Sequence, residues 1–102
     1  MSEISKAAKD NLYTDLREAA IVIDDAEQAA KLRKGDSNFT HATGIVRSLR
    51  RAVEATQERE TIMRNLKEAD EYLGLIGGRA TDAVHAARQL IGEAHYRLAQ
   101  GR

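Results

Sequence analysis

Apolar residues recur every three or four positions through most of the chain, which is the spacing of one face of an α-helix. The first such stretch predicts a helix over residues 2–34, about 50 Å long at 1.5 Å per residue. Its apolar positions are Ile4, Ala8, Leu12, Leu16, Ala19, Ile23, Ala26 and Ala30.

Glycine-containing segments interrupt this spacing twice. In residues 34–38, Gly35 suits the left-handed position after a helix, and Asp36 or Ser37 can cap the helix that follows. In residues 74–78, three glycines in five positions make a continuous helix unfavourable. The breaks therefore predict two further helices, over residues 37–73 and 79–100, with Thr81 and Asp82 as candidate caps of the last one.

Both of these helices carry an apolar stripe, although that of residues 37–73 is polar near its middle, at Thr56 and Glu60. The stripe consists of Phe39, Ala42, Val46, Leu49, Val53, Thr56, Glu60, Met63, Leu66, Asp70 and Leu73. The stripe of the last helix consists of Ala80, Ala83, Ala87, Leu90, Ala94 and Leu98, with Val84 and Ile91 beside it. We predict one all-α domain over residues 1–102, either a three-helix bundle or a long antiparallel helical hairpin with a shorter third helix.

Composition excludes several classes of protein. The chain has 42% hydrophobic and 31% charged residues and contains neither proline nor cysteine. Without cysteine it forms no disulfide framework and no thiolate zinc site. Its apolar runs are far shorter than the roughly 18 residues that a membrane helix needs, and its first residues do not resemble a signal peptide. We therefore expect a cytoplasmic protein that does not enter the membrane.

Much of the apolar content is alanine, which favours helix but buries little area per residue. Such a chain has difficulty burying enough surface alone, so we expect a homo-oligomer, most simply a dimer. Two glycines, Gly44 and Gly92, lie inside predicted helices, each at a cost on the order of 0.8–1.0 kcal/mol relative to alanine. Either another helix approaches closely or a weak spot is tolerated; for Gly92 we favour close packing.

Opposite charges four residues apart line the polar faces, a pattern that predicts solvated surfaces with ion pairs along each helix. The pairs are Lys6–Asp10, Glu27–Lys31, Arg50–Glu54, Glu60–Arg64, Arg64–Glu68 and Lys67–Glu71. Carboxylates and histidine also occur at metal-ligand spacing, in Asp24/Glu27, Glu68/Glu71 and Asp82/His85. Because these pairs stand among the charge ladders, we assign no metal, no cofactor and no catalytic residue.

One stretch of the chain is locally basic, since residues 40–53 contain Arg47, Arg50 and Arg51 but no acidic residue. Further along, Leu75 and Ile76 stand beside glycines in a turn, where apolar side chains need a cover. We predict a partner-binding surface made of Arg47, Arg50, Arg51, Tyr72, Leu75 and Ile76. The leading hypothesis is a small non-enzymatic helical interaction protein, such as a bacterial or phage regulator, inhibitor or adaptor, that binds a partner protein through an exposed helix surface.

A nucleic-acid-binding regulator is the first alternative. It would use the basic patch or the last helix, which carries Arg79, Arg88 and Arg97. Sixteen basic and sixteen acidic residues cancel, whereas nucleic-acid-binding domains usually have a basic excess, so this alternative is not favoured.

A small all-helical metal-dependent or dimeric enzyme is the second alternative. Residues 16–24 (Leu-Arg-Glu-Ala-Ala-Ile-Val-Ile-Asp) resemble the opening helix of the dimeric all-helical chorismate mutases. The resemblance spans nine residues of amphipathic helix, and we carry no functional role over from it.

Overall fold

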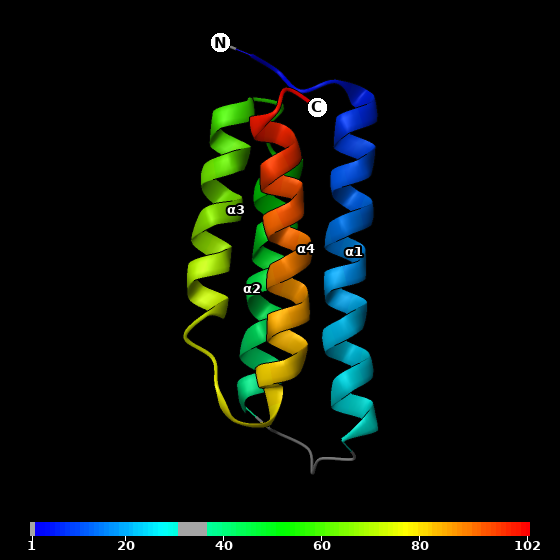
Figure 1. Cartoon of the computed structure of the whole chain (residues 1–102), viewed down its shortest axis with the longest axis vertical. Helices are drawn as coiled ribbons and strands as arrows, with labels where there is room; N and C mark the ends of the chain where they lie inside the picture. Colours follow the sequence, from blue (N-terminus) through cyan, green and yellow to red (C-terminus); the bar gives the residue numbers. More distant parts are fainter. Residues whose placement is uncertain (1, 31–36) are drawn as a thin grey trace.

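The computed structural model describes residues 2–30 and 37–102, which form four α-helices and one short 3₁₀ helix. In chain order these are α1 (Lys6–Ala29), α2 (Ser37–Glu54), α3 (Arg59–Leu73), η1 (Gly78–Ala80) and α4 (Thr81–Ala99). Figure 1 shows the four long helices side by side along one axis, each running opposite to the next. The all-α prediction is therefore confirmed.

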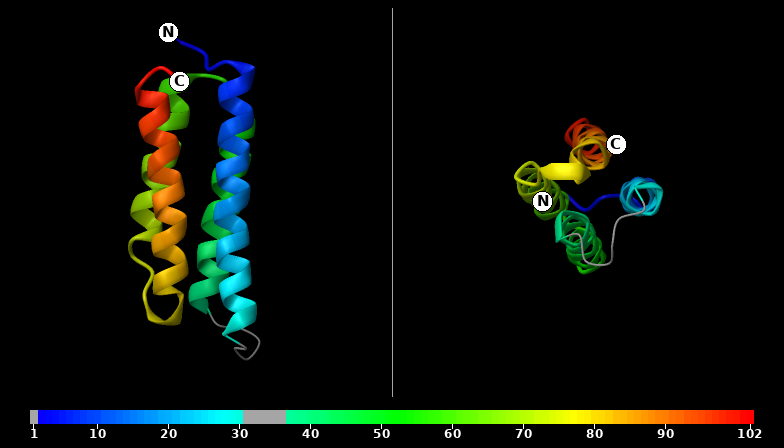
Figure 2. Two further views of the ribbon diagram at one scale, coloured as in Figure 1. Left: turned by 45° about the vertical axis from the view of Figure 1, so that its right-hand side comes forward. Right: turned by 90° about the horizontal axis from the view of Figure 1, so that it is seen from below.

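The helices form a four-helix bundle with up-down-up-down connections. Each helix packs against two others, since α1 and α3 both contact α2 and α4. The end-on view in Figure 2 shows the helices at the corners of a ring around the common core. The bundle is elongated, with extents of 46 × 21 × 21 Å.

The prediction of one helix over residues 37–73 is wrong, and with it the prediction of three helices. The chain reverses between Glu54 and Arg59, so that α3 runs back along α2. The apolar stripe ends at Val53 and resumes at Ile62, with the polar residues Thr56 and Gln57 between them. The polar interruption predicted in the middle of a long stripe is therefore a change of direction.

The reversal also changes which face of α3 is buried. Ile62, Leu66, Ala69 and Leu73 face the core, instead of the predicted Met63, Leu66, Asp70 and Leu73. Asp70 points to α4, where its carboxylate accepts two hydrogen bonds from Arg88, at 2.9 and 3.2 Å.

The other predicted boundaries need smaller corrections. The first helix begins at Lys6, because residues 2–5 are extended and Ser5 caps α1, accepting a hydrogen bond from the Ala8 amide at 3.1 Å. It ends at Ala29, and the predicted cap residues Gly35 and Asp36 lie outside the described residues. The helix predicted over 79–100 is confirmed as α4, although Ala80 stands at its cap position, in place of Thr81 or Asp82.

All four helices bury their apolar faces within the chain. The described residues include 22 buried apolar side chains, and several of the largest, such as Phe39, Leu16 and Leu66, are at most 1% exposed. Seven of the 22 are alanines, which keep neighbouring helices close. The core is therefore closed without a second chain, and the expected oligomer remains a prediction.

The ion pairs of the described residues join different helices. Arg88 pairs with Asp70, and Arg97 of α4 pairs with Asp15 of α1. None of the predicted pairs four residues apart lies within ion-pair distance in the part of the chain that the structure describes. The charged residues of these helix faces thus contact solvent and form no ion pairs along a helix in the described parts of the chain.

Truncation of a side chain of α3 should lower the free energy of unfolding strongly only where that side chain is buried in the core. We expect Leu66→Ala to lower the free energy of unfolding by about 2–5 kcal/mol, because Leu66 is fully buried and its loss leaves a cavity. The neighbouring exposed substitution Lys67→Ala should change it by less than about 0.5 kcal/mol. Urea denaturation followed by circular dichroism measures both values, and equal losses would contradict the α3 register.

Candidate functional site

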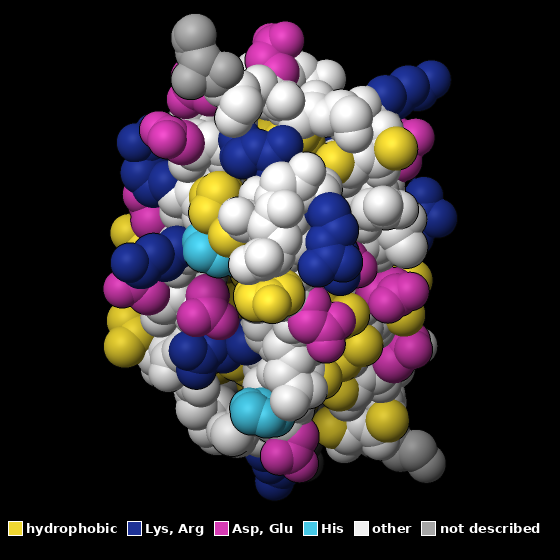
Figure 3. Space-filling model, turned by 45° about the horizontal axis from the view of Figure 1, so that its top comes forward, with side chains coloured by type: hydrophobic (Ala, Val, Ile, Leu, Met, Phe, Trp, Pro, Cys, Tyr) yellow, Lys and Arg dark blue, Asp and Glu magenta, His cyan; other side chains and the backbone are white. Residues whose placement is uncertain are grey.

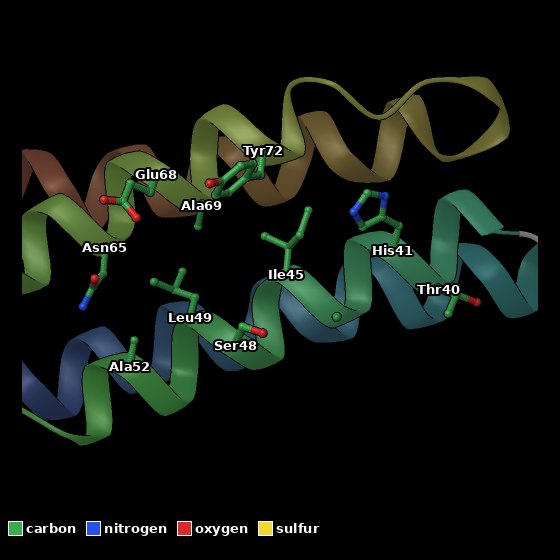
Figure 4. Close-up of a pocket in the computed structure, with 11 residues that line it drawn as sticks. Thr40, His41, Ile45, Ser48, Leu49, Ala52, Asn65, Glu68, Ala69 and Tyr72 are labelled. Atoms are coloured by element: carbon green, nitrogen blue, oxygen red, sulfur yellow. The ribbon is translucent and has the colours of Figure 1, made fainter.

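A groove of about 600 Å³ runs between α2 and α3 on the surface of the bundle. Figure 4 shows it open along its length, with both helices contributing side chains. The residues that line it are Thr40, His41, Gly44, Ile45, Ser48, Leu49 and Ala52 of α2, and Asn65, Glu68, Ala69 and Tyr72 of α3.

The floor of the groove is apolar. Ile45 and Leu49 point from α2 toward α3, and Ala69 points back toward α2 (Figure 4). Leu49 and Ala69 belong to the core, whereas Ile45 is only partly buried, so the core reaches the surface here. This floor exists because α2 and α3 are antiparallel neighbours, which the reversal at residues 55–58 produces.

The α2 side of the groove is low, because the side chains along it are small. Gly44, Ser48 and Ala52 follow one another at four-residue spacing and so lie along one side of the helix. A Cβ atom added at Gly44 would meet nothing within 4 Å. No contact with a described residue explains a glycine in the middle of this helix, which leaves room for the backbone of another chain to approach closely.

Polar groups and one aromatic ring form the rim. His41 and Glu68 are exposed on opposite sides of the groove, with Asn65 further along α3. Tyr72 is 58% exposed and lies on the α3 side (Figure 4). An apolar floor with a polar and aromatic rim is typical of a protein-binding surface.

The predicted partner-binding residues do not form one surface. Arg47, Arg50 and Arg51 are exposed on α2, but none of them lines the groove. Tyr72 does line it.

The two apolar residues of the turn after α3 differ from each other. Leu75 is 84% exposed in the connection to η1, whereas Ile76 is buried in the core. The chain itself therefore covers Ile76, and the prediction that it belongs to an exposed patch is wrong.

Sequence reasoning missed the groove floor and its low α2 side. Ile45, Ser48 and Ala52 lie outside the apolar stripe predicted for a single helix over residues 37–73, and that prediction placed no neighbouring helix beside them. The available signal was the run of Gly44, Ser48 and Ala52, read together with the loss of the apolar stripe after Val53. For Gly92 the favoured close packing is wrong within the chain, because a Cβ atom added there also meets nothing within 4 Å.

The candidate metal ligands do not converge. Across residues 2–30 and 37–102, no group of three or more His, Asp or Glu side chains is placed to hold a metal ion. In the groove a single carboxylate, Glu68, and a single imidazole, His41, stand among neutral side chains. The arrangement is suited to binding.

The arginines of α4 are partly engaged inside the bundle. Arg88 and Arg97 pair with Asp70 and Asp15, and the hydrogen bonds and charge of Asp70 raise the pKa of Arg88. In the view of Figure 3, Lys and Arg side chains alternate with Asp and Glu, and no broad basic face is visible there. These contacts leave α4 less able to present a basic surface to nucleic acid.

A second hollow lies beside α1 and surrounds Lys9, which is only 6% exposed. Its ammonium donates hydrogen bonds to the Thr56 carbonyl oxygen at 2.5 Å and to Gln57 Oε1 at 2.7 Å. It also lies 5.7 Å from the centre of the Tyr13 ring. Lys9 therefore ties α1 to the turn between α2 and α3, which is a structural role.

Burial shifts the titration of this cluster. Desolvation lowers the pKa of Lys9, and the nearby carboxylate of Glu54 partly opposes that shift. Desolvation raises the pKa of Tyr13, and the charges of Glu54 and Asp10 add to it.

Comparison of the chain with protein-family models, curated proteins and solved structures finds no match. None of the helices in the described parts of the chain has the length and apolarity needed to cross a membrane. A functional assignment therefore rests on the geometry of the groove.

Lys9 should give the protein a distinctive alkaline stability profile. Because its pKa is lowered on folding, the unfolded chain holds more protons between the native pKa and the ordinary value, so stability rises with pH there. We expect this rise in the pH range below the ordinary lysine pKa of 10.5, before Tyr13 begins to oppose it. Urea denaturation at stepped pH should show it in the wild type and not in Lys9→Met, and identical slopes would contradict the assignment.

Proposed function

We propose that the chain is a non-enzymatic interaction protein that holds an α-helix of a partner protein in the groove between α2 and α3. The observation that carries the proposal is the groove itself, because Ile45 is only partly buried above the core residues Leu49 and Ala69 and stands beside a glycine that no contact with a described residue requires.

The dimensions suit a helix. The α2 side runs from Thr40 to Ala52, which is about 18 Å of helix axis, or a little over three turns. Helices that bind in grooves use apolar side chains at positions i, i+3 or i+4, and i+7, which need about two turns. A partner helix can therefore place at least three such anchors on the floor.

The low α2 side lets the partner helix come close. Across Gly44, Ser48 and Ala52, the approach is limited mainly by the backbone of α2, and close approach increases the number of van der Waals contacts. Tyr72 offers a rigid aromatic side chain on the opposite side, of the kind often found at energetically important positions of interfaces. These features support a specific helix over an unstructured segment.

Of the exposed arginines of α2, Arg51 extends this surface, because it lies three residues after Ser48 and so stands on the same side of the helix as Gly44 and Ser48. Arg47, Arg50 and Arg51 make no ion pair with any described residue. Arg51 stands where an acidic side chain of a partner protein can pair with it, whereas Arg47 and Arg50 lie on the side of α2 away from the groove. Such contacts would raise the association rate and leave most of the affinity to the groove.

A photo-crosslinking residue placed in the groove tests the proposal. We expect benzoylphenylalanine at Ser48 to form a discrete covalent complex in cells of the producing organism. The same residue at Gln89, which is exposed on α4, should not. Gly44→Leu should abolish the Ser48 complex at unchanged helicity, because the new side chain fills the groove without meeting the bundle. Equal crosslinking from Ser48 and Gln89 would argue against a groove partner.

A further inference from the structure

On the outer side of α2, a small residue stands at an equal distance on each side of Ser48. Gly44 and Ala52 each lie four residues from Ser48, so about 6 Å of helix axis separates Ser48 from either of them. A helix with this symmetry matches an antiparallel copy of itself, because a two-fold axis through Ser48 exchanges Gly44 and Ala52. The contacts of a two-fold dimer are of this self-complementary kind.

We infer that the helix received by the groove is α2 of a second copy of this chain, so that two bundles pair about a two-fold axis at Ser48. This inference rests on the proposed function and names the partner. In the pair, each α2 lies antiparallel to the other and enters the groove of the other copy. Small residues then face small residues along the line of closest approach, with Gly44 of one copy opposite Ala52 of the other.

Charge favours the same register. Arg51 lies three residues beyond Ser48, so the two-fold axis brings it level with Ile45 of the other copy, three residues before Ser48. Ile45 stands on the stretch of groove whose α3 side carries Glu68 and Tyr72 (Figure 4). Arg51 therefore meets a carboxylate and an aromatic ring of the second copy, two groups that a guanidinium can contact together.

Neither Arg51 nor Glu68 forms an ion pair with any described residue, so within that part of the chain both charges are available to a second copy. The formal net charge of zero also means that two copies do not repel each other as whole molecules.

The available area is sufficient. A side of the bundle 46 Å long and 21 Å wide offers about 970 Å². A stable interface of standard size covers about 800 Å² on each partner. An interface of that size would cover most of one side of the molecule, the groove included.

Cysteine crosslinking tests the two-fold axis directly, because the chain has no cysteine of its own. Under mild oxidation, Ser48→Cys should form a disulfide-linked dimer, since residue 48 meets its own copy at the axis. Gly44→Cys alone should not, but a mixture of Gly44→Cys and Ala52→Cys should form the mixed dimer. Gln89→Cys is the control and should stay monomeric. Crosslinking of Gly44→Cys with itself and not with Ala52→Cys would overturn this register.

A charge exchange tests the Arg51–Glu68 contact. In sedimentation equilibrium, Arg51→Glu and Glu68→Arg should each weaken the wild-type dimer by about tenfold or more, and the double variant should recover most of the loss. Arg47→Glu serves as the matched control, because Arg47 lies one residue before the axis on the side of α2 away from the groove, and it should weaken the dimer much less. Failure of the double variant to recover would overturn the contact.

The wild type decides between the inference and the function on which it rests. A dimer at micromolar concentration that Gly44→Leu converts to a folded monomer supports both. A wild-type monomer at 100 micromolar overturns the second copy as the occupant. In that case a foreign protein captured at Ser48 keeps the proposed function, and the absence of any capture removes both.

Discussion

The structure depends on the reversal between α2 and α3. Four residues, 55–58, turn the chain, and they are held from outside the turn. The buried ammonium of Lys9 donates to Thr56 and Gln57, and the Ile4 amide donates to the Gln57 carbonyl at 2.8 Å. Arg59 links the turn to the end of α4, because its guanidinium donates a hydrogen bond to the Leu98 carbonyl at 2.7 Å. Because this turn exists, α2 and α3 lie side by side, and both the closed core and the groove follow.

A lysine in this place resolves a conflict between two requirements. The turn leaves the Thr56 carbonyl without a helix hydrogen bond, and the same end of the bundle must exclude water from Ile4 and Leu12. The long aliphatic part of Lys9 packs with the core while its ammonium supplies the missing donors. Burial of the charge opposes this arrangement, which is why the pKa of Lys9 falls. An apolar residue there would fill the space and leave the Thr56 carbonyl without its donor.

Periodicity predicted the helical class, the faces of the first and last helices, and the break at residues 74–78, because each of these is a local property of the sequence. The number of helices could not be obtained in this way. Thr56 and Glu60 fit the three- and four-residue spacing, so the spacing alone predicts an uninterrupted helix through residues 55–58. The turn at these residues is held by long-range hydrogen bonds from Lys9 and Ile4, which the spacing does not reveal. The groove could not be predicted for the same reason. The surroundings of Ile45 depend on α3, which the sequence analysis had joined to α2 as a single helix.

Two glycines show why local geometry alone does not identify a site. Gly44 and Gly92 both lie within helices, both are exposed, and a Cβ atom added at either would meet nothing within 4 Å. Their neighbours differ. Around Gly92 stand the exposed polar residues Gln89 and Glu93 and, beside them, Arg97, which pairs with Asp15, so a weak spot in the helix has no further consequence. Around Gly44 the missing side chain leaves Ile45 partly exposed beside the buried Leu49, and Ile45 loses the rest of its contact with water when another helix covers it. The same backbone feature is therefore a tolerated defect on α4 and an opening to the core on α2.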